Sequence, residues 1–305
     1  MASVLYERVR RTLVICRETR LAFPGVFMGI TGCQTGSDSA TLMLKDDAIL
    51  RDGRNELDWC ALCAAVDAVL GAPSDMKTGP RVRPATAHLD LQMTGAAMRG
   101  DIAIDGRFVG FSEGRLVTQS LVSAVIRSGE TLIGHTSSAS VLREFPEDRA
   151  RAAWPWLPDG YAMDSPDSVT FDEKERLALE ACKLAEVAAT EAHPFIEHFW
   201  CGIPRADNGN ARLSVRVTPH LGNRIGHVQG GILLGMALKV ADAAAPEDMR
   251  PSNISAYFIS PGIGQVLDVR SQLAQRGRSL ATVRTQIIGP SGKLVLEATS
   301  QHVLK

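Results

Sequence analysis

A loop that ends in two glycines has the residue types and spacing to bind a carbonyl oxygen. Asn223, Gln229, Gly230 and Gly231 lie in the stretch NRIGHVQGG, which runs directly into the apolar segment ILLGMALKVADAA. Where a helix begins, its first backbone N–H groups have no partner within the helix and carry the positive end of the helix dipole. Glycine at both positions lets a carbonyl approach without obstruction by a Cβ atom. The pattern indicates an oxyanion hole, and a glycine-rich turn that serves helix packing explains it equally well.

A single acidic side chain interrupts a second apolar segment. Asp67 lies in WCALCAAVDAVLG, where an unpaired carboxylate is costly to bury. Either a catalytic role or a structural hydrogen bond would account for it. Further along, Thr86 and His88 lie two positions apart and therefore on one side of a predicted strand. Both are candidates for the same site, although a β-branched residue is also typical of strands and a single histidine is often structural.

Two other motifs are not expected to form sites. Gly110, Ser112 and Gly114 match the G-x-S-x-G pattern, which needs a helix after the serine, but the following RLVTQSLVSAVI alternates like a strand and indicates a hairpin turn. Cys60 and Cys63 are separated by two residues, yet no second Cys/His pair has zinc spacing. We expect neither a nucleophilic serine nor a metal.

The composition excludes several classes of function. The chain has 305 residues with 33 Lys+Arg and 34 Asp+Glu, so it has no excess positive charge to bind nucleic acid or an anionic membrane. With 45% hydrophobic and 22% charged residues it is expected to fold around a core. The first twenty residues lack a signal-peptide pattern, the longest apolar stretch (225–238) is shorter than the ~20 residues of a membrane span, and the cysteines are scattered. These features predict a soluble, cytoplasmic protein.

The chain contains two copies of one pattern. Residues 277–304 repeat residues 114–142: a Gly-Arg pair, an alternating strand, a Ser-Gly turn and a second alternating strand. Upstream, residues 57–73 resemble residues 230–246. Each copy has strands, one long apolar helix (56–70 and 230–244) and further strands, judged by the change between periods of 2 and 3.6 residues. One apolar helix against a strongly bent antiparallel sheet is an α+β unit.

The pattern also predicts the boundaries of the parts. We expect an N-terminal helix in 1–20, a first unit in 21–144, a linker in 145–192 and a second unit in 193–305. The linker divides into a Pro- and Trp-rich loop (145–169) and a helix that begins with Thr170 as its N-cap. Residues 26–33 and 195–202 are expected to form the first strand of each unit.

The glycine motif, followed by an apolar helix, a strand and the two closing strands, resembles the hotdog-fold acyl-CoA thioesterases, especially the phenylacetate-pathway type. The first copy resembles the acyl-CoA thioesterase II type, which is itself a tandem of two hotdogs. The resemblance covers the chain except the N-terminal helix and residues 145–192. It implies two tandem hotdog units, each a long helix wrapped by a bent antiparallel sheet. Together they would form a pseudo-dimer within one chain.

The resemblance also implies where the active site lies. In such dimers one unit supplies the Asn and Gly-Gly loop, and the other supplies an acid on its central helix and a Ser or Thr on the following strand. The family acid lies nine residues after the motif His, a position that Leu238 occupies in the second copy and Asp67, nine residues after Asp58, occupies in the first. The implied composite site comprises Asn223, Gln229, Gly230 and Gly231 of the second copy and Asp67 and Thr86 of the first.

An alternative site follows from the thioesterase II type, which has a catalytic Gln on its last strand. Gln301 matches that position, and its partners would be Asp242 with Ser252 or Asn253. In the main site Gln229 replaces the commoner His, so no titrating imidazole is expected there. His227 does not occupy the motif position.

Weaker candidates for substrate binding are four basic side chains. Arg115, Arg276 and Arg278 lie at predicted turns, where coenzyme A phosphates are often bound in this fold, and His88 lies beside Thr86. Solvated surface charge is the plain alternative for the arginines.

The sequence therefore predicts hydrolysis of an acyl-CoA, or a related acyl thioester, to the free acid and the thiol. Gly230 or Gly231 would polarise the carbonyl, and Asp67 would act as general base or as nucleophile. No metal and no cofactor other than the substrate's coenzyme A is expected, and the pseudo-dimers are expected to form a homo-oligomer. The alternatives are a non-catalytic acyl-thioester-binding protein, favoured by Gln229 and Leu238, and a hydratase or dehydratase, whose Asp-x-Asn-Pro-x-His pattern the chain lacks.

Overall fold

One continuous antiparallel sheet spans both halves of the molecule. The computed structural model describes residues 3–79, 81–144 and 169–305, and in it twelve strands follow the order β1-β2-β4-β5-β6-β3-β9-β12-β11-β10-β8-β7. The first six in this order come from the first half of the chain and the last six from the second half. Strands β3 and β9 pair at the centre, where His88 lies opposite Tyr257 and Gln92 opposite Asn253. The two units therefore share one sheet.

The helices and strands have the following bounds. The helices are α1 Val4–Thr19, α2 Phe23–Phe27, α3 Trp59–Thr78, α4 Glu173–Ala188, α5 Phe195–Trp200 and α6 Gly230–Ala244. The strands of the first half are β1 Thr31–Thr35, β2 Ser39–Leu44, β3 Val82–Met93, β4 Ile102–Glu113, β5 Thr118–Ser128 and β6 Thr131–Glu144. Those of the second half are β7 Arg205–Asp207, β8 Asn210–Arg216, β9 Met249–Phe258, β10 Val266–Arg276, β11 Leu280–Ile288 and β12 Leu294–Leu304.

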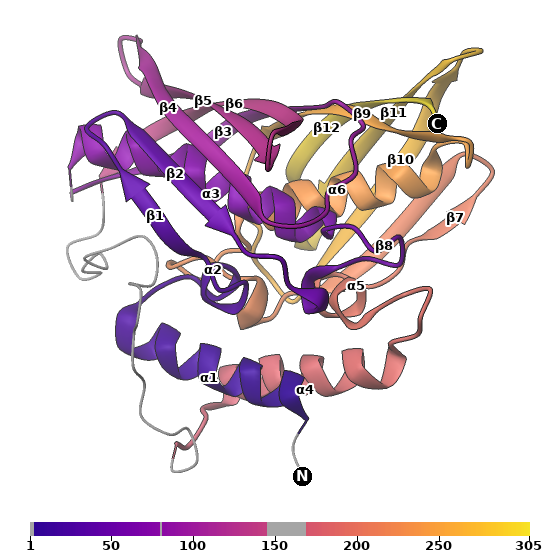
Figure 1. Cartoon of the computed structure of the whole chain (residues 1–305), viewed down its shortest axis with the longest axis horizontal. Helices are drawn as coiled ribbons and strands as arrows, with labels where there is room; N and C mark the ends of the chain where they lie inside the picture. The colour runs from indigo at the N-terminus through magenta and orange to yellow at the C-terminus, as the bar shows by residue number, and fades with distance from the viewer. Residues whose placement is uncertain (1–2, 80, 145–168) are drawn as a thin grey trace.

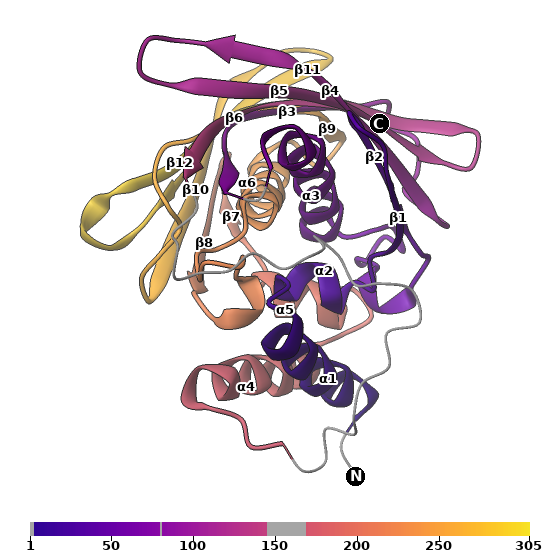
Figure 2. The ribbon, with the colours of Figure 1, turned by 90° about the vertical axis from the view of Figure 1, so that its left-hand side faces the viewer.

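The molecule has three layers. The bent sheet lies above α3 and α6, which pack against each other in its concave face (Figure 1). The third layer, called the lower layer below, lies on the side away from the sheet and comprises α1, α2, α4 and α5, with α2 and α5 next to the two central helices (Figure 2). The predicted α+β architecture is confirmed: each half has one long apolar helix wrapped by a bent antiparallel sheet.

The two central helices are apolar on nearly all sides, because each is covered by the sheet, by the other central helix and by the lower layer. Thirteen of the twenty residues of α3 are buried. The Asp58 side chain caps α3 by accepting a hydrogen bond from the backbone N–H of Cys60 at 2.8 Å, and Gly79, at a φ of 77°, ends it. Helix α6 begins after Gln229, whose side chain makes no capping hydrogen bond. The first N–H groups of α6 are therefore left for other partners.

Two predicted strands are wrong, and both lie in or next to the lower layer. Residues 195–202 do not form a strand: Phe195–Trp200 form α5, in which Phe195 and Phe199 are four residues apart and stack on one helix face with ring centroids 5.0 Å apart. Residues 26–33 divide between the end of α2 and the start of β1. In α2, Phe27 packs on Phe199 at 5.1 Å and edge-on to Trp200 at 5.6 Å.

The linker helix also starts later than predicted. Asp172, not Thr170, is the N-cap of α4, because Asp172 and Glu175 form a reciprocal capping box. Residues 145–168 of the predicted loop lie outside the described residues. At the N-terminus, α1 occupies Val4–Thr19, within the range predicted for the first helix.

Glycines let the backbones of α3 and α6 meet. A Cβ atom on Gly235 would lie 2.4 Å from the Cα of Cys60, and one on Gly231 would lie 2.2 Å from the carbonyl oxygen of Cys63. Neither contact is possible between non-bonded atoms, so both positions require glycine while the helices keep this distance. The helix packing that was one interpretation of Gly231 is therefore real.

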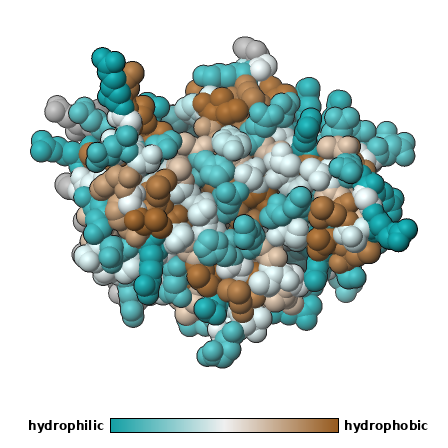
Figure 3. Space-filling view, turned by 90° about the horizontal axis from the view of Figure 1, so that it is seen from above, coloured by the Kyte–Doolittle hydropathy of each residue, from teal (hydrophilic) through white to brown (hydrophobic). Residues whose placement is uncertain are grey.

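The outer face of the sheet is mixed in polarity. Seen from above, hydrophilic side chains separate several small apolar patches (Figure 3). No helix among the described residues is long and apolar enough to cross a membrane. The predicted homo-oligomer stays a prediction.

The helix contact can be tested with two glycine substitutions. We expect Gly235→Ala to lower the free energy of unfolding by about 1–3 kcal/mol, because the new methyl group overlaps the backbone at Cys60. Gly71→Ala on α3 is the matched control, since a Cβ there meets no atom within 4 Å and alanine favours a helix by up to about 1 kcal/mol. Urea unfolding followed by circular dichroism measures both. Equal stabilities for the two variants would contradict the close helix contact.

Candidate active site

The loop before α6 is held by the side chain of Asn223. Its Oδ1 accepts hydrogen bonds from the backbone N–H groups of Ile225 at 3.0 Å and His227 at 3.1 Å. Gly226 has a φ of 81° at the turn of the loop, and Gly222 and Val228 pair as an isolated bridge. The folded loop ends at Gln229, the N-cap of α6, so that Gly230 and Gly231 are the first two residues of the helix. Asn223 thus shapes the loop, and it also lines the cavity described below.

Asp67 receives two hydrogen bonds, one from each half of the molecule. Its Oδ2 accepts the backbone N–H of Gly231 at 3.1 Å, and its Oδ1 accepts the hydroxyl of Thr86 at 3.0 Å. A Cβ on Gly230 would lie only 3.1 Å from the same carboxylate. Burial raises the pKa of Asp67, while the hydrogen bonds from Thr86 and Gly231 act in the opposite direction. The result is a buried carboxylate that attracts a proton more strongly than an exposed aspartate.

Gln229 leaves one polar atom without a partner. Its Nε2 donates to the carbonyl oxygen of Ala64 on α3 at 3.3 Å. Its Oε1 is buried and accepts no hydrogen bond from any described residue. A buried acceptor without a donor is unfavourable unless a bound molecule or water supplies one. Because Gln229 lines the cavity, a ligand there can provide that donor.

These groups meet at a cavity of about 590 Å³. Asp67, Thr86, Asn223, Gln229 and Gly230 all line it, whereas Gly231 contributes only through its N–H on Asp67. The volume lies in the usual range for small-molecule sites. Much of the wall is apolar and comes from four places, the region around α2, helix α3, helix α6 and the end of β9: Leu21, Val26, Ile30, Ala68, Ala72, Leu233, Phe258 and Ile259.

Three arginines of the cavity were missed in the sequence. Arg83 and Arg143 lie opposite each other on β3 and β6, and Arg224 lies in the loop before α6. Burial, and the charge of Arg143, lower the pKa of Arg83. Their positions depend on strand register and loop folding, and Arg83 lies before the strand predicted from residue 86, so no local signal in the sequence pointed to them.

The other predicted basic residues lie elsewhere. None of His88, Arg115, Arg276 and Arg278 lines this cavity. His88 belongs to the central strand pair, where its Nε2 is 3.0 Å from the Ser255 hydroxyl and its ring lies 4.7 Å from that of Tyr257. Arg276 is 3.7 Å from Asp248 at the surface, and Arg115 is exposed in the turn between β4 and β5.

The alternative constellation comes together only in part. The Asn253 Nδ2 donates to Gln301 Oε1 at 2.9 Å, and the Ser252 hydroxyl donates to the Gln301 carbonyl at 3.1 Å. Asp242 instead lies 3.5 Å from Arg54 and 3.8 Å from the Nδ1 of His302. None of the four predicted residues lines the 590 Å³ cavity.

The first half contains a loop equivalent to that of Asn223. Asp52 Oδ1 accepts the N–H groups of Arg54 and Glu56 in the same pattern, 171 residues before Asn223 and its two donors. The same separation relates the helix caps Asp58 and Gln229. The position 171 residues after Asp67 is Leu238, which is apolar and 1% exposed. The two central helices are thus equivalent in structure but not in chemistry.

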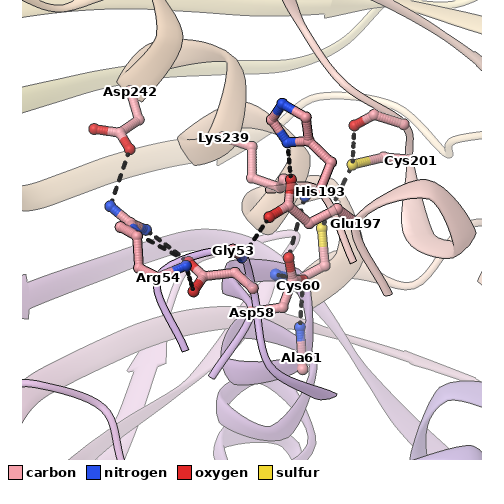
Figure 4. Close-up of polar contacts among 12 residues, drawn as sticks. Gly53, Arg54, Asp58, Cys60, Ala61, His193, Glu197, Cys201, Lys239 and Asp242 are labelled. Carbon is pink, nitrogen blue, oxygen red and sulfur yellow. Dashed lines mark hydrogen bonds and ion pairs between the residues drawn. The ribbon is translucent and has the colours of Figure 1, made fainter. Parts of the chain in front are cut away.

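Charged side chains fill the equivalent place at the start of α3. The Lys239 Nζ of α6 lies 3.1 Å from Asp58 Oδ2, and both side chains are almost completely buried (Figure 4). Glu197 accepts the backbone N–H of Gly53 at 2.9 Å. Asp58 Oδ1 accepts the N–H groups of Cys60 and Ala61, while its Oδ2 pairs with Lys239. The N–H groups at the start of α3 are therefore already hydrogen-bonded within the protein.

The raised pKa of Asp67 gives a pH dependence of stability. Below the unfolded-state pKa of about 3.9 the carboxyl is protonated in both states, and above it the folded state binds the proton more strongly. The free energy of unfolding therefore falls as the pH rises towards the folded-state pKa. We expect Asp67→Asn to be more stabilised relative to the wild type at pH 7 than at pH 4, measured as the difference in Tm. The same difference at both pH values would contradict an unfavourable buried charge.

Comparisons with known proteins agree with this architecture. Residues 218–302 match the family model of the acyl-CoA thioesterase N-terminal domain. No curated protein matches the sequence. Among solved structures, the tesB protein of Mycobacterium avium subsp. paratuberculosis is 11% identical with a TM-score of 0.54, over 89% of this chain and 95% of that chain.

Two further structures have the same fold. A protein from Lactobacillus plantarum, assigned as an oleoyl thioesterase, is 10% identical with a TM-score of 0.56, over 87% of this chain and 95% of that chain. A hot dog fold protein of unknown function from Alicyclobacillus acidocaldarius is 10% identical with a TM-score of 0.54, over 90% and 96%. The predicted resemblance is thereby confirmed in two respects: the chain has the tandem hotdog fold, and residues 218–302 match an acyl-CoA thioesterase domain.

Proposed function

We propose that the protein hydrolyses an acyl-CoA, or a closely related acyl thioester, at one composite site between its two units. The observation that carries this proposal is the placement of Asp67 of the first unit against the N-terminus of α6 of the second, at the wall of a cavity. A carboxylate, a hydroxyl and a helix N-terminus at one cavity are the groups that acyl transfer to water requires.

The N–H of Gly230 is the donor for the thioester carbonyl oxygen. The N–H of Gly231 already donates to Asp67, whereas that of Gly230 makes no hydrogen bond to any described residue, and Gly230 lines the cavity. The α6 dipole adds positive potential where negative charge develops on the oxygen. One such donor in a preorganised site typically contributes ~10²–10³ in rate.

Asp67 activates the attack on the carbonyl carbon. As general base it takes a proton from a water molecule, whose oxygen bonds to the carbonyl carbon while the thiolate leaves. As nucleophile its carboxylate bonds to the carbonyl carbon and displaces the thiolate, and water then hydrolyses the resulting anhydride at the Asp67 carbonyl. Its raised pKa makes it a stronger base than an exposed aspartate, and Thr86 fixes its orientation. The unpartnered Gln229 Oε1 accepts the second hydrogen of the attacking water.

The cavity accommodates the two parts of the substrate. Its apolar wall, formed by residues such as Val26, Ile30 and Phe258, suits an acyl chain. The positive charges of Arg83 and Arg143 suit a thiol carrier that bears phosphates. These two arginines replace Arg115, Arg276 and Arg278 as the residues proposed for that role.

The central test is release of free thiol from short, long, branched and aromatic acyl-CoAs. We expect Asp67→Asn to reduce kcat/KM on the preferred substrate by about 10²–10⁴, because the base is lost while the side-chain shape is kept. Asp242→Asn is the matched control, since it removes a carboxylate from the other central helix outside the cavity, and it should retain wild-type activity. Circular dichroism shows whether each variant keeps the fold.

Other outcomes assign the function differently. Loss of activity in Asp242→Asn but not in Asp67→Asn would move the site to Asp242 and Gln301. Tight binding of an acyl-CoA without thiol release from any substrate would establish the non-catalytic binding protein instead.

A single turnover in ¹⁸O-labelled water separates the two roles of Asp67. A general base delivers the label directly to the product acid. A nucleophile transfers its own unlabelled oxygen to the product in the first turnover, and the label enters the carboxyl group of Asp67. Mass spectrometry of the acid and of the peptide that contains Asp67 measures both.

A further inference from the structure

Two cysteines from different units touch inside the molecule. Cys60 lies in the first turn of α3 and Cys201 directly follows α5, and their sulfur atoms are 4.0 Å apart (Figure 4). Cys60 is completely buried, whereas Cys201 is 7% exposed. The contact joins positions 141 residues apart.

A buried ammonium group lies beside this pair. Burial disfavours the charge on Lys239, but Asp58 and the sulfurs of Cys201 and Cys60 outweigh this effect and raise the pKa of Lys239, so it stays protonated. Glu197 lies 4.0 Å from Lys239 and is also in contact with His193, whose Nδ1 is 3.2 Å from its carboxylate. A fixed positive charge next to a thiol stabilises the thiolate form.

The two sulfurs differ in access. A cavity of about 240 Å³ between α4, α5 and β8 has Cys201 in its wall, together with Trp200 and Leu184. Cys60 does not line it. Of the two cysteines, Cys201 is therefore the one on the side from which a small molecule such as hydrogen peroxide would approach, and Cys60 lies behind it.

The pKa values of the two thiols also differ, and the difference again favours Cys201 as the first to react. The hydrogen bond from Cys60, and the charge of Lys239, lower the pKa of Cys201 despite its burial. Burial raises the pKa of Cys60 well above that of an ordinary thiol. Cys201 is accordingly the nucleophile of the pair, and Cys60 is the thiol that follows.

We propose that Cys60 and Cys201 form a peroxide-oxidisable dithiol that closes to a disulfide between the two units. The Cys201 thiolate attacks one oxygen of hydrogen peroxide, the O–O bond breaks, and hydroxide leaves to form water with one proton, giving a sulfenic acid. The Cys60 sulfur then bonds to Cys201 and displaces the sulfenic hydroxyl, which leaves as water with the Cys60 proton. Two thiols are oxidised and one peroxide is reduced to two waters.

The other thiols lack this combination of features. Among the five cysteines whose side chains are described, Cys16, Cys63 and Cys182 have no sulfur partner, and burial raises the pKa of each. The described residues contain no cluster of three or more side chains able to hold a metal ion, so metal binding does not explain the pair.

The experiment treats the folded, reduced protein with hydrogen peroxide and then alkylates the remaining thiols. We expect the loss of two thiols per chain, a cross-linked peptide that joins Cys60 to Cys201, and recovery of both thiols with dithiothreitol. Unchanged thiols under conditions that oxidise free cysteine would overturn the proposal. So would irreversible oxidation of Cys201 while Cys60 stays a free thiol.

Two variants define the order of the steps. Cys60→Ser should stop the reaction at the Cys201 sulfenic acid, which dimedone traps with a measurable mass increase. Cys63→Ser removes a buried thiol one turn further along the same helix and should leave the cross-link unchanged. A cross-link that is lost in Cys63→Ser, or that still forms in Cys60→Ser, would assign the reaction to another pair.

Discussion

The close approach of α3 and α6 positions everything else in this molecule. Helices normally pack with their axes 8–10 Å apart and with side chains between them, but Gly231 and Gly235 bring one backbone directly onto the other at Cys63 and Cys60. This contact places a carboxylate of one helix at the positive end of the other, so that Asp67 accepts the N–H of Gly231. The candidate site exists because two units meet, and neither unit alone contains it.

The pseudo-symmetry of the fold makes the differences between the halves informative. At equivalent positions, Asp58 replaces Gln229 and Leu238 replaces Asp67. In one half the helix N-terminus is open to a cavity, and in the other a buried carboxylate and Lys239 occupy it. A buried carboxylate and an unpartnered amide oxygen, as at Asp67 and Gln229, cost stability, whereas the capped start of α3 and its paired Lys239 leave no such groups. The N-terminus of α6 therefore stays open to the cavity beside Asp67, whereas the N-terminus of α3 is closed by Asp58 and Lys239.

Much of this arrangement could be predicted from the sequence, because the repeat and the change of hydrophobic period are local patterns. The joining of Asp67 and Thr86 to Gly231 followed from a family resemblance and the residue spacing that it implies. The aromatic helix α5 was misread as a strand because six residues are too short for periodicity to decide, and packing against Phe27 decides instead. The contact of Cys60 with Cys201 and the cavity arginines depend on strand register and on the lower layer, which no local pattern encodes.

The central claim is that one substrate binds per chain, between the units at Asp67 and Gly230. A crystal structure with a non-hydrolysable thioether analogue of an acyl-CoA tests it most directly. We expect one analogue per chain, with its sulfur beside Asp67, its carbonyl-equivalent atom within hydrogen-bond distance of the Gly230 N–H, and its acyl chain against Val26 and Ile30. An analogue bound beside Asp242 and Gln301, or two analogues per chain at equivalent positions, would contradict the claim.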